Sequence, residues 1–178
     1  LYERGNLRGL PDDGLAADMY EATQEFADAC DMPAYEVSNH ARAGAQSRHN
    51  LIYWRYGDYV GVGPGAHGRI TVDNKRIATS TTQNPESWLR QVELEGTAST
   101  DDELIAPIDQ ASEYLMMSLR LSEGSDMDRF SSLSGFSLDR QVIDRNQELG
   151  LLKVERNRLV ATSRGRIILN TLLKDLLV

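Results

Sequence analysis

Apolar residues recur every three or four positions over three stretches of the chain, and each stretch predicts an amphipathic helix. The first is expected to span about residues 12–30, with proline and acidic residues at its start. The second opens at Asn84 and stops before a glycine. The third follows a predicted capping box at 100–103 and either continues from it or restarts at Pro107. Its apolar stripe is expected to pack in a core.

Aromatic and β-branched residues predict two short strands, at Tyr35–Val37 and Tyr59–Val62. The helix before Tyr35 makes an αβ unit of the kind that a parallel sheet contains. A β-hairpin is expected further along, with residues 69–72 and 76–79 flanking Asp73-Asn74-Lys75.

From residue 125 the pattern changes to two short helices, two short strands and a last helix. The helices are expected near 127–133 and 138–149, and the strands at 151–155 and 159–161. Thr162 or Ser163 is expected to cap the last helix. This is the order of a winged-helix unit, which can bind DNA through a helix in the major groove. Residues 137–178 carry a net charge of only +3, which favours a packing module over a DNA-binding one.

The composition narrows the functional classes. The net charge of −8 argues against bulk attraction to nucleic acid or anionic membrane. The single cysteine, Cys30, excludes an internal disulfide and a zinc cluster of cysteines, and it is expected to be a buried thiol. With no signal peptide and no apolar run near ~20 residues, we expect a cytoplasmic protein without a membrane segment. The chain begins at Leu1, so a targeting segment could precede it.

Candidate chemistry concentrates between Pro33 and Arg69, which hold all three histidines and a dense glycine run. Gly63-x-Gly65-x-x-Gly68 has the dinucleotide-binding spacing, but a strand rather than a helix is predicted after it, which argues against a Rossmann site. The histidines lack metal-ligand spacing, so no metal ligand is predicted. His67 is either a ligand-facing ring among glycines or a buried, hydrogen-bonded one. Glu36 either pairs with an arginine or faces a cavity of the sheet.

Three motifs in order resemble the radical SAM proteins related to oxygen-independent coproporphyrinogen III oxidase, in particular the haem-chaperone branch called HemW. The matching motifs are Tyr35-Glu36-Val37-Ser38-Asn39, His49-Asn50-Leu51-x-Tyr53-Trp54 and Gly61-x-Gly63-Pro64-Gly65-Ala66-His67-Gly68. The resemblance covers nearly the whole chain, and it identifies the chain as the C-terminal portion of such a protein. It implies an α/β fold: the end of a partial (β/α) radical SAM barrel, a β-hairpin and a helical, winged-helix-like C-terminal domain. The domains are then expected at 1–83, 84–124 and 125–178.

The resemblance also implies cofactors and site residues. The full-length family binds S-adenosyl-L-methionine (SAM) and a [4Fe–4S] cluster held by three cysteines in a CxxxCxxC motif, which this chain lacks. The cofactor-binding residues are expected to be Gly63, Gly65, Ala66 and His67, near the adenosyl group. The substrate cavity is expected to be lined by Glu36, Ser38, Asn39, Asn50, Tyr53 and Trp54. No catalytic residue is assigned, and the chain by itself is expected to be inactive and to bind no cluster.

Ser38 and Asn39 stand where the oxidase is expected to have an acid and a histidine, which favours the haem-chaperone branch. The expected partners are haem or a porphyrin and a haem-acceptor protein, with no nucleic acid. Two alternatives stay open. One is a coproporphyrinogen III oxidase of porphyrin biosynthesis, and the other is a winged-helix DNA-binding regulator.

Overall fold

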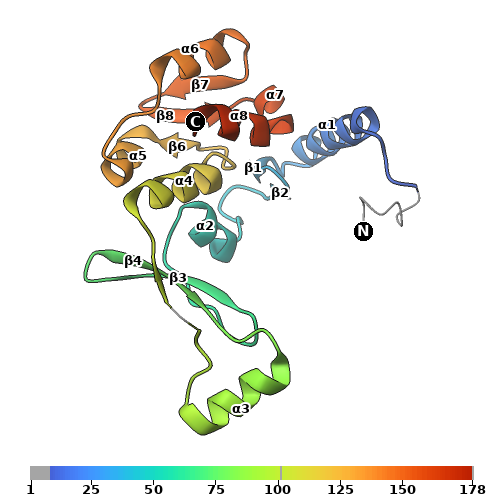
Figure 1. Ribbon diagram of the computed structural model, residues 1–178. Coiled ribbons are helices and arrows are strands. Elements are labelled where there is room, and N and C mark those ends of the chain that lie inside the picture. Colours follow the sequence, from blue (N-terminus) through green and yellow to red (C-terminus); the bar gives the residue numbers. More distant parts are fainter. Residues whose placement is uncertain (1–8, 101, 178) are drawn as a thin grey trace. The chain divides into compact units, whose positions relative to one another are not determined.

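The computed structural model describes residues 9–100 and 102–177, and the chain divides into two compact units between Gln46 and Ser47 (Figure 1). The first unit contains α1 (Asp13–Ala29), β1 (Ala34–Glu36) and β2 (Asn39–His40). The predicted helix over 12–30 is confirmed as α1. It begins at Asp12, whose carboxylate accepts a hydrogen bond of 2.8 Å from the backbone N–H of Leu15.

The apolar stripe of α1 is largely exposed. The side chains of Leu15, Met19 and Phe26 are each more than half exposed, whereas Ala27 is buried. The prediction of a buried thiol at Cys30 is wrong, because Cys30 is exposed at the C-terminal end of this helix. The reason is that the stripe on which Cys30 was placed packs against little within its own unit.

The strand predicted at Tyr35–Val37 exists as β1, but its pairing differs from the expected one. β1 pairs antiparallel with β2, through Ala34 opposite His40 and Glu36 opposite Asn39. A tight turn joins the two strands, so the described strand forms a two-stranded hairpin rather than the parallel pair expected of an αβ unit. The barrel itself stays a prediction.

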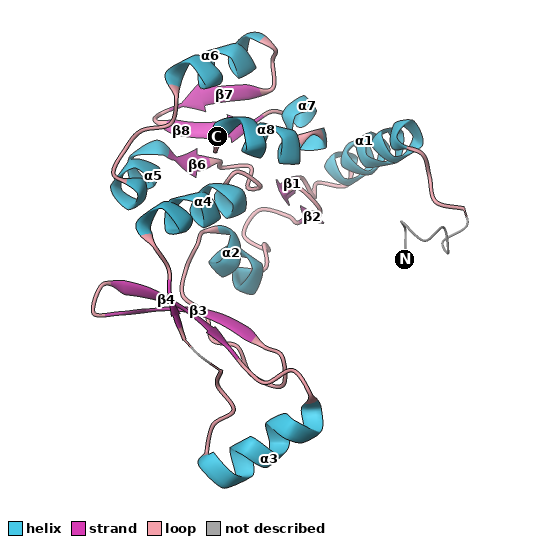
Figure 2. Ribbon diagram, in the orientation of Figure 1, coloured by secondary structure: helices cyan, strands magenta, loops and turns pink. Residues whose placement is uncertain are grey.

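The second unit has two three-stranded sheets and seven helices among its described residues (Figure 2). The first sheet has the order β3-β4-β5, and its region contains α2 (Arg48–Trp54), β3 (His67–Val72), β4 (Lys75–Ser80), α3 (Pro85–Glu95) and β5 (Glu103–Leu104). The second sheet has the order β6-β8-β7, and its region contains α4 (Pro107–Ser118), β6 (Ser125–Asp126), α5 (Met127–Ser134), α6 (Arg140–Glu148), β7 (Leu152–Glu155), β8 (Arg158–Ala161), α7 (Ser163–Ile167) and α8 (Leu169–Leu176).

The predicted hairpin is confirmed as β3 and β4, which pair in register from His67 opposite Ser80 to Val72 opposite Lys75. Asp73 and Asn74 form the turn with φ of 50° and 60°, as a two-residue type I′ loop requires. The helix expected after Asn84 is confirmed as α3.

Two expectations in this region are wrong. Glu103 of the predicted capping box lies in β5, and α4 begins at Pro107, so the helix starts at the second of the two expected places. The segment Tyr59–Val62 is not a strand. It makes one isolated bridge, Tyr59 to Arg69, and the side chains of Val60 and Val62 are 72% and 87% exposed. Its glycines divert the chain from the sheet after one pair.

The order helix, helix, hairpin, helix predicted after residue 125 is found in α5, α6, β7–β8 and the last helix, which is divided into α7 and α8 at Ile168. Thr162 caps α7, since its hydroxyl accepts a hydrogen bond from the N–H of Gly165. The largest fully buried apolar side chains come from α4 and its C-terminal end, α5, β8 and α8: Leu115, Leu119, Leu121, Phe130, Leu159 and Leu172. The domain boundaries expected after residues 83 and 124 stay predictions. None of the helices in the described part of the chain is both long and apolar enough to cross a membrane.

Candidate functional site

The short helix α2 places the aromatic residues of the second motif on one side. It begins at Ser47, whose hydroxyl accepts a hydrogen bond from the N–H of Asn50 at 3.3 Å. His49 and Tyr53 are four residues apart and therefore lie on the same face. Their rings meet edge to face with centroids 4.7 Å apart, and Tyr53 Oη lies 3.2 Å from His49 Nε2. The His49 ring is exposed and the Tyr53 ring is half-buried.

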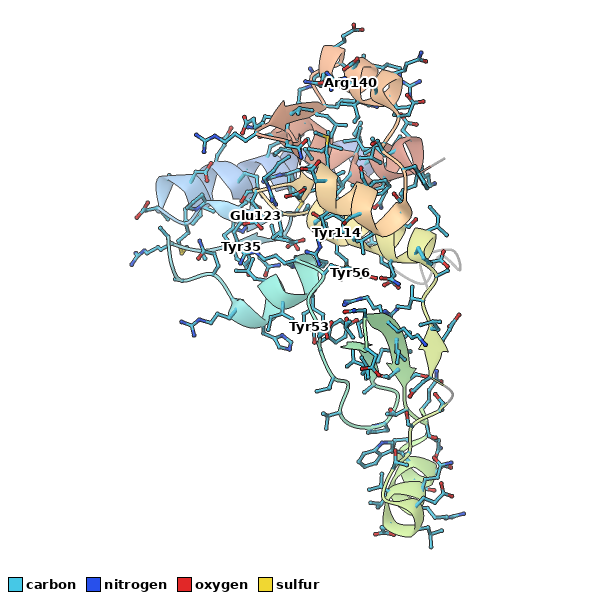
Figure 3. The ribbon with its side chains drawn as sticks, turned by 90° about the vertical axis from the view of Figure 1, so that its left-hand side faces the viewer. Tyr35, Tyr53, Tyr56, Tyr114, Glu123 and Arg140 are labelled. Atoms are coloured by element: carbon cyan, nitrogen blue, oxygen red, sulfur yellow. The ribbon has the colours of Figure 1, made fainter. Side chains whose placement is uncertain are left out.

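A cavity of about 270 Å³ opens beside α2, between this helix, β3 and α4. Two of its lining residues, Tyr53 and Tyr56, are labelled in Figure 3. Its walls are aromatic and thioether side chains with one ion pair: Tyr53, Tyr56, Tyr59, Arg69, Glu113, Met116 and Met117. The rings of Tyr53 and Tyr59 are 4.3 Å apart between centroids and form one wall. A cavity lined mostly by apolar and aromatic groups, with a few convergent polar atoms, has the character of a small-molecule site.

The ion pair in the cavity joins Arg69 of β3 to Glu113 of α4. Arg69 Nη2 donates to Glu113 Oε1 at 2.8 Å, and Tyr56 Oη donates to Oε2 of the same carboxylate at 2.8 Å. Burial favours a higher pKa for Glu113, but the hydrogen bonds from Arg69 and Tyr56 outweigh it and hold the pKa below its usual range. Glu113 is therefore a carboxylate at neutral pH, and its charge is neutralised inside the protein.

A second arginine, Arg76, packs against Tyr56 of the cavity wall. The guanidinium of Arg76 stacks on the Tyr56 ring at 3.8 Å from its centroid and donates to Asp58 Oδ1 at 2.7 Å. Burial works to raise the pKa of Asp58, but its hydrogen bonds with Thr71 and Arg76 lower it overall. Burial and the hydrogen bond to Glu113 raise the pKa of Tyr56 far above its usual value. The stacked guanidinium of Arg76 and the hydrogen bond to Glu113 together orient the Tyr56 ring.

Trp54 is the last residue of α2, and unlike Tyr53 it is not among the residues that line the cavity. The guanidinium of Arg120 lies over its ring, 4.6 Å from the centroid. The indole N–H of Trp54 is buried and has no hydrogen-bond partner among the residues that the structure describes. A buried indole N–H ordinarily donates a hydrogen bond. An acceptor for the indole N–H of Trp54 would come from outside the described residues.

The glycine loop before β3 owes its glycines to its own packing. A Cβ added to Gly61 would lie 2.6 Å from the carbonyl oxygen of His67, and one added to Gly68 would lie 3.0 Å from the backbone nitrogen of Gly61. Gly63 and Gly65 have φ of 103° and 68°, which side chains disfavour. Close backbone contact and positive φ therefore explain the four glycines without a ligand.

Hydrogen bonds hold this loop against the end of β4. Thr81 Oγ1 donates to the carbonyl of Gly63 at 2.6 Å and accepts from the N–H of Ala66 at 2.9 Å. The N–H of Gly65 donates to the carbonyl of Thr82. His67 is exposed at the start of β3, which argues against the alternative of a buried, hydrogen-bonded ring. An added Cβ at Gly63 would meet no atom within 4 Å, so open space lies beside the loop there.

The other predicted cavity residues belong to the first unit. Glu36 is fully buried, and its Oε2 accepts hydrogen bonds from the N–H and hydroxyl of Ser38 and from the side-chain amide of Asn39, the last at 2.6 Å. The carboxylate thus closes the turn between β1 and β2. The predicted set therefore falls into two groups: Glu36, Ser38 and Asn39 in the first unit, and Asn50, Tyr53 and Trp54 in the second.

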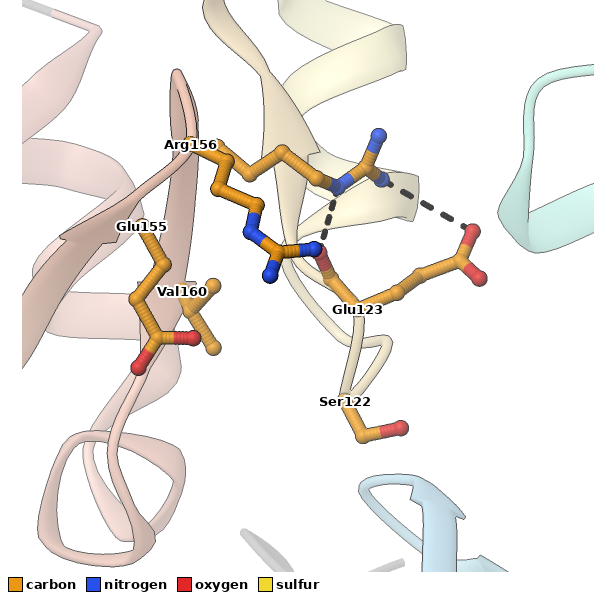
Figure 4. Close-up of a pocket in the computed structure, with 6 residues that line it drawn as sticks. Ser122, Glu123, Glu155, Arg156 and Val160 are labelled. Carbon is orange, nitrogen blue, oxygen red and sulfur yellow. Dashed lines mark hydrogen bonds and ion pairs between the residues drawn. The ribbon is translucent and has the colours of Figure 1, made fainter.

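A second, more polar pocket of about 570 Å³ lies beside the turn between β7 and β8 (Figure 4). Arg158 donates to the carbonyls of Glu123 and Gly124, each at 2.6 Å, while the Glu123 carboxylate forms a two-bond pair with Arg55. Arg156 lies at the same pocket, at a turn position with positive φ. These groups mainly tie the segment after α4 to the β7–β8 hairpin.

Sequence reasoning missed most of the residues that make the cavity. Tyr53 was predicted, but Tyr56, Tyr59, Arg69 and Glu113 were not. The available signals were the three tyrosines between residues 53 and 59 and an arginine, Arg69, in the strand that follows. Among the described residues, no group of three or more His, Cys, Asp or Glu is arranged to hold a metal ion.

Comparison with known proteins finds a domain family and several relatives. Residues 105–168 match the HemN C-terminal domain. The chain is 33% identical over 168 residues to the heme chaperone HemW of Escherichia coli, covering 93% of this chain and 43% of that protein. It is 34% identical over 178 residues to the mitochondrial radical S-adenosyl methionine domain-containing protein 1 of Bos taurus, covering 94% and 40%. The chain spans less than half the length of these relatives.

The fold has a counterpart among solved structures. The structure of coproporphyrinogen III oxidase (HemN) from Escherichia coli, a radical SAM enzyme, superposes with a TM-score of 0.68 at 15% identity. The match covers 94% of this chain and 42% of that one. At this identity the likeness shows the shared fold, which confirms the mixed α/β class expected from the sequence.

Proposed function

We propose that this chain is part of a cytoplasmic haem chaperone, because residues 105–168 match the HemN C-terminal domain and the chain is similar in sequence to HemW and to a mitochondrial radical S-adenosyl methionine domain-containing protein. In this role the protein binds haem and passes it to an acceptor protein. The observation that carries the proposal is the aromatic and thioether cavity beside α2, together with the exposed His49, whose ring contacts Tyr53 of the cavity wall.

Among the three histidines, His49 is the one suited to bind haem iron at this cavity. His40 belongs to the first unit, where its ring contacts Gln24 at 3.2 Å, and His67 lies at the glycine loop. His49 shares a face of α2 with Tyr53, whose hydroxyl contacts one ring nitrogen and leaves the other for iron. Imidazole is a common axial ligand of haem, and a hydrogen bond to its second nitrogen orients the ring.

The family's cofactors differ in how they relate to this chain. One cysteine cannot supply the thiolates of a [4Fe–4S] cluster, so residues outside this chain would hold it. SAM would supply the radical chemistry of the family when bound. The contact of Gly63, Gly65, Ala66 and His67 with SAM stays a prediction, supported by the open space beside Gly63.

Haem titration followed by Soret absorbance tests the proposal on the 178-residue chain. We expect saturable binding of one haem, and we expect His49→Ala to weaken binding at least about tenfold, a loss of about 1.4 kcal/mol. His40→Ala and His67→Ala are the matched controls and should bind as the wild type does. Equal affinity in all three variants would remove His49 from the site, and absence of saturable binding in the wild type would refute the proposal.

The oxidase alternative rests on the shared fold with HemN. Ser38 and Asn39 stand against it, because both side chains are bonded to Glu36 and shape a turn. Conversion of coproporphyrinogen III to a decarboxylated product by a cluster-loaded full-length protein would favour the oxidase.

A further inference from the structure

The cavity beside α2 is too small for a whole porphyrin. Its volume of about 270 Å³ lies just below the range of ~300–1,000 Å³ that encloses ordinary small ligands. One edge of a macrocycle could enter a cavity of this size, and the rest of the ring would stay outside it. The tyrosine rings offer flat apolar walls, and the thioethers of Met116 and Met117 adapt to the shape of what enters.

The charges of the cavity decide which edge fits. Among the described residues that line it, Arg69 is the one cation, and its guanidinium is already paired with Glu113 at 2.8 Å and with the carbonyl of Gly68 at 3.0 Å. Tyr56 donates its hydroxyl proton to the same Glu113. Arg76, behind the Tyr56 ring, is paired with Asp58. The cavity therefore offers an entering carboxylate no uncompensated positive charge.

Iron porphyrins differ at their edges. Haem and iron coproporphyrin III carry the same four methyl groups and the same two propionates on one side of the ring. At the two positions where haem carries vinyl groups, iron coproporphyrin III carries two further propionates. A propionate pushed into the cavity would lose its water and meet the Glu113 carboxylate, and both effects are unfavourable. A vinyl or methyl group would replace water against tyrosine and methionine, which is favourable.

We infer that this cavity is a specificity site that accepts the apolar, vinyl-bearing edge of haem and rejects a propionate-bearing edge. The inference rests on the proposed function, because it concerns which tetrapyrrole the chain binds. It assigns Glu113 the role of neutralising Arg69, and it assigns Met116, exposed at the rim, the role of lining the entrance.

The test compares haemin with iron coproporphyrin III as titrants of the 178-residue chain, each followed by Soret absorbance. Because iron is present in both, a difference reports on the ring edge. We expect the wild type to prefer haemin at least about tenfold, equal to about 1.4 kcal/mol. Glu113→Gln leaves Arg69 unneutralised, so the preference should fall below about threefold. Met116→Lys adds a free cation at the rim and should shift the preference the same way without disturbing the ion pair.

Glu123→Gln is the matched control, because Glu123 forms the same kind of pair with Arg55 away from the cavity. It should keep the wild-type preference. If Glu113→Gln is unfolded by circular dichroism, Met116→Lys decides. Wild-type affinities within twofold of each other, or a preference that survives Met116→Lys and a folded Glu113→Gln, would overturn the inference while leaving haem binding in place. A wild type that binds neither titrant would instead refute the proposed function, and with it the inference.

Discussion

Replacing Glu113 by glutamine tests whether the ion pair with Arg69 holds α4 to the β3–β4 hairpin. The two side chains are 25% and 23% exposed, so the pair lies between the buried and surface extremes. Breaking a fully buried pair costs about 3–5 kcal/mol, and losing a surface pair costs at most about 1 kcal/mol. Because glutamine keeps one of the two acceptor oxygens that Arg69 and Tyr56 use, we expect a loss of about 1–2 kcal/mol in the free energy of unfolding. For a chain of this size that lowers Tm by roughly 3–7 °C.

The stabilisation by Glu113 should also depend on pH in a definite direction. The pKa of Glu113 in the folded chain is lowered, so its stabilisation is complete above the unfolded pKa and is lost as pH falls through the folded pKa. The difference in unfolding free energy between wild type and Glu113→Gln should therefore be constant from about pH 5 to 8 and shrink below that range.

Urea denaturation followed by circular dichroism, repeated from pH 7 down to pH 3, measures this difference. Glu123→Gln is the control, because its pair with Arg55 has side chains 53% and 41% exposed and should contribute less than about 1 kcal/mol. Equal losses in the two variants at pH 7 would contradict the argument from burial. A difference that grows in acid would contradict the assigned direction of the pKa shift.

Two further predictions concern the glycine loop and the cysteine. Gly68→Ala should lose about 1–3 kcal/mol in urea denaturation, because its Cβ would overlap the Thr79 hydroxyl and lie 3.0 Å from the Gly61 nitrogen. Gly14→Ala, inside α1 with no contact below 3.5 Å, should be neutral or stabilising. Cys30 should react with a thiol reagent such as DTNB in the native chain nearly as fast as in denaturant, since it is exposed, and strong protection would show that the stripe of α1 is covered.

Local chemistry made much of the fold predictable. Short sequence patterns predicted the starts of three helices and one hairpin. The helices α1, α3 and α7 begin at capping residues or a proline, and the β3–β4 hairpin has the residues of a type I′ turn. Tyr59–Val62 failed because pairing, not propensity, decides a strand, and the glycines after Tyr59 end its pairing. α2 was missed because seven residues are too few to show helical periodicity, although Ser47 is a good cap.

The candidate site was predictable only in part, because it is assembled from distant segments. Tyr53 and His49 were visible in one motif, but Glu113 lies 44 residues beyond Arg69, and nothing in the local sequence joins them. The thioethers of Met116 and Met117 were read as core, whereas Met116 is 42% exposed at the cavity rim. A cavity forms where the faces of different helices and strands meet. Hydrophobic periodicity shows which face of an element is apolar, but not which other face it packs against.

The position of iron in the haem-loaded chain would show whether His49 and the cavity beside α2 bind haem. Anomalous diffraction from crystals of the 178-residue chain with haem would locate the metal independently of the protein atoms. We expect iron bound to the His49 ring, with an apolar edge of the porphyrin packed against the wall that Tyr53 and Tyr59 form and against Met116. Iron bound elsewhere, with the cavity beside α2 empty, would contradict it.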